Sequence, residues 1–268
     1  GAMSPSRRAG SRPPFRLPRV AALTPGRGGQ PRLLIDAPSG AAEIYLHGAH
    51  LTSWAPRGGG EALFTSRKAV FDGESAIRGG VPLCLPWFAS GPDGARRPSH
   101  GWARIMEWEL RCVETQPDGS VRVLMALEND GLSLLYEISV GEELGLSLSI
   151  SNRGQAPRSV EAALHTYLRV GDVKDVTVEG LDGARYFDKV RGRYSTQRGD
   201  LSFVGFTDRV YTTTQQVQVV DPKLDRRIIV DKNGSGSTIV WNPWSAGAAS
   251  MSDVGEGEWQ NFVCVETA

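Results

Sequence analysis

Residues 121–150, VRVLMALENDGLSLLYEISVGEELGLSLSI, decide the fold class. Apolar side chains occupy every second position of 121–128, which is the period of a β-strand: Val121, Val123, Met125 and Leu127. Two more alternating runs, 134–140 and 144–150, meet around residues 141–143. The turn sequence Pro117-Asp118-Gly119 precedes the first run and is typical of a hairpin. The stretch therefore predicts consecutive antiparallel strands.

The same pattern continues toward the C-terminus, where strands are predicted at 217–220, 227–230, 238–241 and 262–265. Glycine (32 residues) and proline (16) are spread between the runs as turn residues, and no long helical periodicity is present. Many short strands with frequent turns are typical of a sandwich or barrel. We predict an all-β protein, a large antiparallel β-sandwich, with residues 32–268 as one domain.

The first 31 residues have a different composition. Gly1-Ala2-Met3 is typical of a remnant of recombinant expression and is set aside. Residues 4–31 are rich in arginine, proline and glycine and contain no acidic residue, which predicts a flexible segment over 1–31. A transit peptide is an alternative, because such peptides are rich in arginine, but the segment lacks an amphipathic period.

Composition excludes several classes of function. Lys plus Arg and Asp plus Glu both total 30, so the basic excess of a nucleic-acid or membrane-surface binder is absent. No run of 18 apolar residues predicts a transmembrane helix. Cys84, Cys112 and Cys264 form no CxxC pair, which favours reduced thiols in a cytoplasmic protein. No zinc-ligand spacing is found, so we expect no metal and no cofactor.

Three segments differ from ordinary sandwich sequence. Residues 66–108 form a long segment rich in glycine, proline and aromatic residues that contains Arg78, His100 and Arg104. Residues 161–168 read as a strand with His165 in its middle, and the last strand leads to Glu266. On the residues alone, each has a structural alternative: a loop that caps the sandwich, a core histidine and an exposed chain end.

Together these segments resemble the aldose 1-epimerase superfamily, specifically its glucose-6-phosphate 1-epimerase branch. Seven motifs carry the resemblance in the same order: Ile77-Arg78-Gly79-Gly80-Val81-Pro82, Pro86-Trp87-Phe88, His100-Gly101-Trp102-Ala103-Arg104 with Trp108, Leu164-His165-Thr166-Tyr167, Thr207-Asp208-Arg209-Val210-Tyr211, Val240-Trp241-Asn242-Pro243-Trp244 and Cys264-Val265-Glu266. The resemblance implies a galactose mutarotase-like β-sandwich (supersandwich) that interconverts the α and β anomers of a hexose 6-phosphate.

The resemblance also implies residue roles. His165 would be the general acid and Glu266 the general base, while His100 and Asp208 would contact sugar hydroxyls. Arg78 and Arg104 would hold the phosphate, because a guanidinium matches phosphate geometry, and Arg67 is a third candidate. We expect a small-molecule sugar phosphate as the only partner, without nucleic acid or membrane, and a monomer.

Two positions depart from the family pattern: Ser99 stands where glutamine is common, and Trp102 where Phe or Leu is common. Both lie beside the expected pocket and put the sugar preference in doubt more than the reaction. Two other functions stay open. A glycoside hydrolase could use Glu266 and Asp208 as its carboxylate pair. A carbohydrate-binding module would need the aromatic residues and loops, but has no use for His165 together with Glu266.

Overall fold

The computed structural model describes residue 13 and residues 15–268, and these form two compact units. Unit 1 contains the described residues up to 60, together with 71–76 and 103–159. Unit 2 contains 61–70, 77–102 and 160–268. Every strand pair in the described residues is antiparallel, as predicted. The protein is all-β, and its described part contains a single short α-helix, α1 (Trp244–Ala248).

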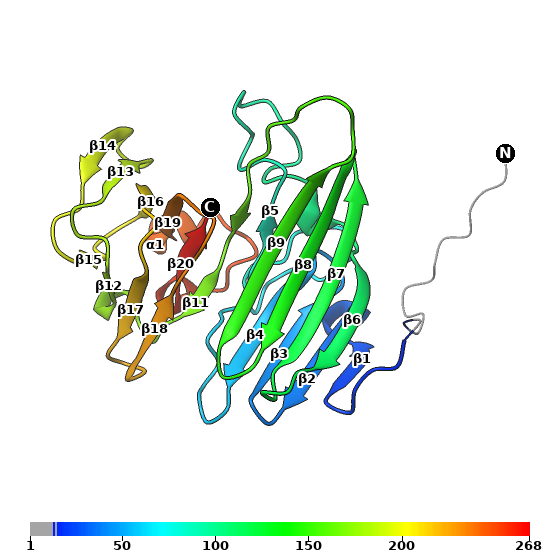
Figure 1. Ribbon diagram of the computed structural model, residues 1–268. Helices are drawn as coiled ribbons and strands as arrows, with labels where there is room; N and C mark the ends of the chain where they lie inside the picture. The colour runs from blue at the N-terminus through cyan, green and yellow to red at the C-terminus, as the bar shows by residue number, and fades with distance from the viewer. Residues whose placement is uncertain (1–12, 14) are drawn as a thin grey trace. The chain divides into compact units, whose positions relative to one another are not determined.

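Unit 1 consists of two four-stranded sheets (Figure 1). The first follows chain order: β1 (Ala21–Pro25), β2 (Pro31–Ala37), β3 (Gly40–Tyr45) and β4 (His50–Pro56). The second does so too: β6 (Glu109–Thr115), β7 (Val121–Asn129), β8 (Leu132–Val140) and β9 (Leu144–Asn152). Two 3-10 turns, η1 (Arg27–Gly29) and η2 (Ala103–Ile105), complete the unit.

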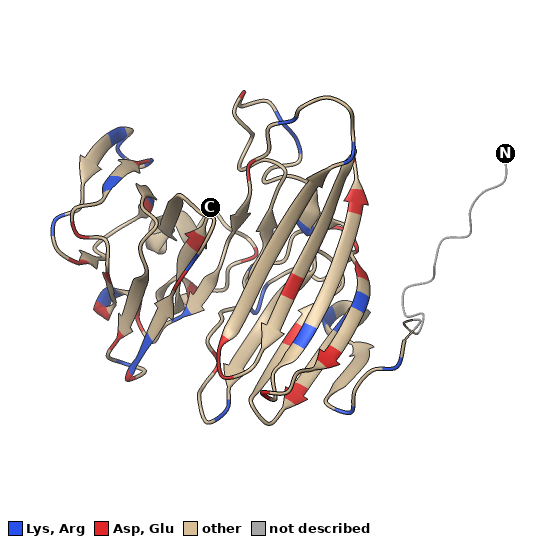
Figure 2. Ribbon diagram, in the orientation of Figure 1, with Lys and Arg blue, Asp and Glu red and all other residues tan. Residues whose placement is uncertain are grey.

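The alternation in residues 121–140 sorts side chains between the two faces of the second sheet. Val121, Val123 and Met125 are fully buried, and so is Tyr136, which lies opposite Met125 on β8. Arg122 alternates with these residues and pairs with glutamates on β6 and β8. Figure 2 shows charged residues along the strands of this sheet. The predicted hairpin at Pro117-Asp118-Gly119 is confirmed, since the amide of residue 116 donates to the carbonyl of residue 120. A sheet with one apolar and one polar face is suited to form one layer of a β-sandwich.

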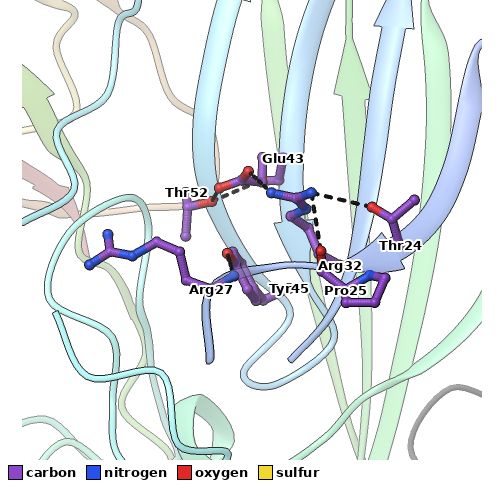
Figure 3. A network of polar contacts seen from close by, with 7 residues as sticks. All are labelled: Thr24, Pro25, Arg27, Arg32, Glu43, Tyr45 and Thr52. Atoms are coloured by element: carbon purple, nitrogen blue, oxygen red, sulfur yellow. Dashed lines mark hydrogen bonds and ion pairs between the residues drawn. The ribbon is translucent and has the colours of Figure 1, made fainter. Parts of the chain in front are cut away.

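The N-terminal prediction needs correction, because strand β1 lies inside the segment expected to be flexible. Arg32 on β2 explains the order of this strand (Figure 3). Its guanidinium donates to Glu43 Oε2 at 2.8 Å, and to Thr24 Oγ1 and the Pro25 carbonyl at 3.3 Å. These bonds fix β1 against β2 and β3. The arginine-rich, proline-rich composition hides this short strand, and residues 1–12 and 14 lie outside the described residues.

Unit 2 consists of an eight-stranded and a four-stranded sheet, with two 3-10 turns, η3 (Val173–Asp175) and η4 (Glu258–Asn261). The larger sheet has the order β14 (Arg193–Thr196), β13 (Arg185–Asp188), β16 (Thr207–Thr212), β19 (Ser237–Asn242), β20 (Phe262–Thr267), β10 (Ala163–Leu164) and β5 (Leu83–Cys84), with β11 (Tyr167–Arg169) also paired to β20. The smaller has the order β15 (Leu201–Ser202), β12 (Thr177–Glu179), β17 (Val217–Asp221) and β18 (Arg226–Val230).

All four strands predicted late in the chain are confirmed, as β17, β18, β19 and β20. The strand predicted over 161–168 is interrupted at His165, which separates β10 from β11. The amide of His165 donates to the Pro82 carbonyl at 3.0 Å, which continues the pairing of β10 with β5 by one residue. The amide of Val265 on β20 donates to the Thr166 carbonyl at 3.0 Å, so the pairing with β20 also continues across the gap between β10 and β11.

Candidate active site

One face of the eight-stranded sheet collects the candidate side chains. Across adjacent strands, Asp208 on β16 lies opposite Trp241 on β19, Trp241 opposite Cys264 on β20, and Cys264 opposite Tyr167 on β11. Opposite residues in antiparallel strands project from the same face. Glu266 follows Cys264 by two positions, so it projects from this face as well. The register of the sheet thus brings together residues that are far apart in the sequence.

His165 and Glu266 meet because of the same register. Leu164 pairs with Thr267, and Tyr167 pairs with Cys264, so the register is continuous across the gap between β10 and β11. It places His165 directly opposite Glu266. Their side chains are in contact, with 3.5 Å between Nε2 of His165 and Oε1 of Glu266. An imidazole and a carboxylate in contact form a pair of proton-transferring groups.

Glu266 is a buried carboxyl group, with only 1% of its side chain exposed, while His165 keeps 11%. Burial raises the pKa of Glu266 well above its ordinary value, and the negative charge of Asp208 raises it further, whereas Lys189 opposes the rise. Glu266 Oε1 has no hydrogen-bond donor within the described chain. A carboxylate that is desolvated and poorly stabilised is a stronger base than one in water.

Aromatic rings hold the imidazole of His165 in place. The Tyr167 ring stacks on it at 5.0 Å, and Trp241 meets it edge-on at 5.8 Å. Trp241 also packs against a buried cluster in the same unit: Phe64, Tyr167, Phe262 and Cys264. Because this cluster fixes both rings, His165 has few alternative orientations. Rigid support of this kind is what an acid-base group requires.

His100 lies beside His165, with 6.1 Å between the ring centroids. Its Nδ1 accepts a hydrogen bond from the Ala89 amide at 2.9 Å, which leaves Nε2 as the N–H donor of the neutral ring. The Phe88 ring packs edge-on against it at 4.6 Å. His100 has a positive φ of 61°. The neighbouring Gly101 has a φ of 76° and no room for a side chain, because a Cβ there would lie 2.0 Å from the Leu85 carbonyl oxygen.

Asp208 is the second carboxyl group of this face. Burial raises its pKa, Lys189 lowers it, and Asp188 raises it again. It influences Glu266 through its charge, so both carboxyl groups belong to one electrostatic environment. His165, Glu266, His100 and Asp208 therefore lie close together in the structure.

The three predicted arginines differ in their surroundings. Arg78 donates through Nε to Asp253 Oδ2 at 3.1 Å and through a terminal nitrogen to the Tyr167 hydroxyl at 3.0 Å. Arg67 has a side chain that is 77% exposed, with its Nε 3.9 Å from the buried Glu258. Arg104 belongs to unit 1, whereas the other six predicted site residues belong to unit 2. Arg78 is thus tied to this site through the hydroxyl of Tyr167.

Sequence reasoning missed three residues of the site. Tyr167 lies inside a quoted motif and follows His165 by two positions, so strand periodicity alone places it on the same face. Asp253 and Lys189 lie in segments without a motif, and only the three-dimensional contacts reveal them. Cys84 and Cys264 are buried, as predicted, whereas Cys112 is only partly buried, and none of the three forms a disulfide within the described residues.

No cluster of three or more His, Cys, Asp or Glu side chains suited to a metal ion occurs among the described residues. Within the same residues, no helix has the length and apolar character needed to cross a membrane.

Comparison with known proteins identifies the family. The family model for aldose 1-epimerase matches residues 31–268. An Escherichia coli protein named "Putative glucose-6-phosphate 1-epimerase" is 36% identical over 248 residues, covering 88% of this chain and 82% of its own length. A Cenchrus ciliaris protein of the same name is 33% identical, with 85% and 74% covered.

Solved structures agree with these sequence matches. A crystal structure described as a "putative mutarotase" from Salmonella typhimurium superposes with a TM-score of 0.86 at 32% identity, covering 94% of this chain and 87% of that one. A galactose mutarotase-like protein from Clostridium acetobutylicum, 12% identical, has a TM-score of 0.68 over 92% of this chain and 87% of its own, which bears on the fold alone. The chain has the galactose mutarotase-like fold and belongs to the aldose 1-epimerase family, whose members are isomerases that act on sugars.

Proposed function

We propose that the protein interconverts the α and β anomers of a hexose 6-phosphate, with Glu266 as general base and His165 as general acid. The 3.5 Å approach of these two side chains carries the proposal. The oxygen that loses a proton and the oxygen that gains one are both bonded to C1 of the sugar. A base and an acid for this reaction must therefore lie side by side, and the position of His165, between β10 and β11 and opposite Glu266 on β20, supports these roles.

The reaction requires no net proton change. Glu266 takes the proton of the C1 hydroxyl while His165 donates one to the ring oxygen, and the bond between C1 and the ring oxygen breaks. The product is an open-chain aldehyde, with Glu266 protonated and His165 neutral. Rotation about the C1–C2 bond presents the other carbonyl face, and both protons then return as the ring closes.

The environment of Glu266 suits this role. Its raised pKa makes its carboxylate a stronger base than an exposed glutamate, which favours removal of the proton from the C1 hydroxyl. His100 and Asp208 flank the pair, and both offer polar atoms for sugar hydroxyls. Trp241 supplies an apolar surface of the kind that stacks on a sugar ring.

The phosphate belongs to the proposal because the relatives named above carry glucose 6-phosphate in their names. Arg78, Arg104 and Arg67 remain the predicted arginine contacts. Arg78 already shares its charge with Asp253, so a phosphate there would have to compete with a carboxylate.

Anomer exchange followed by NMR tests the acid-base pair. The protein should accelerate exchange between α- and β-glucose 6-phosphate, and His165→Ala or Glu266→Gln should each slow it by about 10²- to 10⁴-fold. His47→Ala is a matched control, because His47 is also a buried histidine but lies in unit 1, where it contacts the Ser75 carbonyl. Wild-type exchange rates in both site variants would refute the assignment. Release of free sugar from a glycoside would instead indicate a hydrolase.

A further inference from the structure

Lys189 occupies a fixed position beside the candidate active site. It follows β13, and its backbone amide donates to the Asp208 carbonyl at 2.9 Å, which continues the pairing of Asp188 with Arg209 by one residue. Lys189 is therefore the neighbour of Asp208 in the row that leads to Trp241 and Tyr167. The Asp188 carboxylate accepts from the amides of Val190 and Arg191 at 2.9 and 3.1 Å, which fixes the turn behind it.

The ammonium group of Lys189 points toward the site. Its Nζ lies 4.9 Å from the centre of the Phe88 ring, which itself packs on His100. His100 in turn faces His165. Two aromatic rings, those of Phe88 and His100, thus lie between the lysine and the proposed acid. The charge also reaches the carboxyl groups, since Lys189 lowers the pKa of both Asp208 and Glu266 against the effect of burial.

The charge of Lys189 differs from that of Arg78 in one respect. Arg78 is ion-paired with Asp253, whereas Lys189 is exposed and forms no ion pair with any carboxylate of the described chain. The contact of an ammonium ion with an aromatic ring is weaker than an ion pair with a phosphate. A phosphate can therefore replace this contact or bind the ammonium group in addition to it. The lysine is therefore available to an anionic ligand that enters this site.

We infer that Lys189 is a specificity-determining residue that binds the phosphate group of the hexose 6-phosphate. The inference rests on the proposed function and adds the residue that selects the phosphorylated sugar. The phosphate is attached through C6 to C5, on the far side of the ring oxygen from C1. A cation that contacts the phosphate must therefore lie near the His165–Glu266 pair but not between the two side chains. Phe88 and the turn after β13 hold Lys189 in such a position.

Substrate discrimination tests the inference. Exchange is measured by NMR on glucose 6-phosphate and on free glucose for the wild type, Lys189→Met and Lys189→Arg. We expect Lys189→Met to lower kcat/KM for the phosphate by about 10- to 100-fold, mainly through KM, and to lower kcat/KM for glucose much less. Lys189→Arg should restore most of the loss. Lys223→Met is the matched control, because Lys223 is an exposed lysine of the same unit in the turn between β17 and β18.

The outcomes separate the two proposals. If the wild type exchanges no anomers, the proposed function fails. If it does exchange them and Lys189→Met keeps full preference for the phosphate, only the role of Lys189 fails. An equal loss on both sugars, with a shifted pH profile, would also overturn the role, because it would mean that the lysine acts through Glu266. Inorganic phosphate gives an independent readout: it should inhibit the wild type at lower concentration than Lys189→Met, or Lys189→Gln if the methionine variant does not fold.

Discussion

Glu266 connects activity to stability at the scale of a single residue. Its pKa is raised in the folded protein relative to the ordinary value of 4.5, so the folded state binds its proton more tightly than the unfolded state does. The contribution of this group to stability is then full below pH 4.5 and is lost as the pH rises through the raised pKa. The ionised carboxylate that the reaction needs is thus a form that destabilises the fold.

Glu266→Gln should therefore stabilise the protein increasingly as the pH rises. We expect the Tm of the variant relative to that of the wild type to increase as the pH rises above 4.5, while anomer exchange is lost. Glu256→Gln, at an exposed carboxyl of the same unit, is the control. A Tm difference that does not grow with pH would contradict the argument.

The sequence predicts this site by motif order and not by geometry. His165 and Glu266 are 101 positions apart in numbering, and only the register of β10, β11 and β20 makes them neighbours. The position of Tyr167 can be predicted, because this residue lies two positions after His165 in the same motif and therefore on the same face of the strand. Asp253 and Lys189 belong to a loop and a turn, whose positions depend on packing that no local pattern encodes.

At the scale of elements, strands with a clean alternation are predictable and very short ones are not. Strands β7, β8 and β9 have nine residues each, which is enough for the period of two to be visible. Strands β5 and β10 have two residues each and are defined by their partners in the sheet. The segment with the proposed chemistry is built from such elements: His165 lies between β10 and β11, and His100 lies in the loop between β5 and η2.

The loop that carries His100 depends on Gly101 for its path. Replacing Gly101 with Ala places a Cβ 2.0 Å from a backbone oxygen at a φ of 76°, so the loop has to move. We expect a loss of at least about 3 kcal/mol in urea denaturation, from the positive φ and the clash together, and slower anomer exchange. Gly94→Ala is a close control, with a φ of 73° and nothing within 4 Å of the added Cβ, and should cost about 1–2 kcal/mol. Equal losses in the two variants would show that the close approach to Leu85 is unimportant.

At the scale of the whole molecule, we predict a single domain over 32–268, and the structure divides into two compact units. Each unit consists of several separate stretches of the chain. Alternating strands with turns between them look the same whichever sheet they join, so local patterns do not show which strands share a unit. Unit 2 takes residues 61–70 and 77–102 from the first half of the chain and 160–268 from the second. The site accordingly combines Arg78 and His100 with His165, Asp208 and Glu266.

This division predicts that residues 160–268 do not fold alone, although they contain the proposed acid and base. Without 61–102, β10 loses the pairing of Ala163 with Cys84, and Leu168 loses its bridge to Leu63. The fragment also loses the contribution of Val81, Leu83 and Leu85, all fully buried in the complete unit, and burial of each such side chain stabilises by about 1.5–3 kcal/mol. We expect a poorly dispersed amide NMR spectrum and no cooperative urea transition for 160–268, with the full chain as the control. A dispersed spectrum with a cooperative transition would show instead that the last 109 residues, 160–268, hold their sheet together without the loop that carries His100.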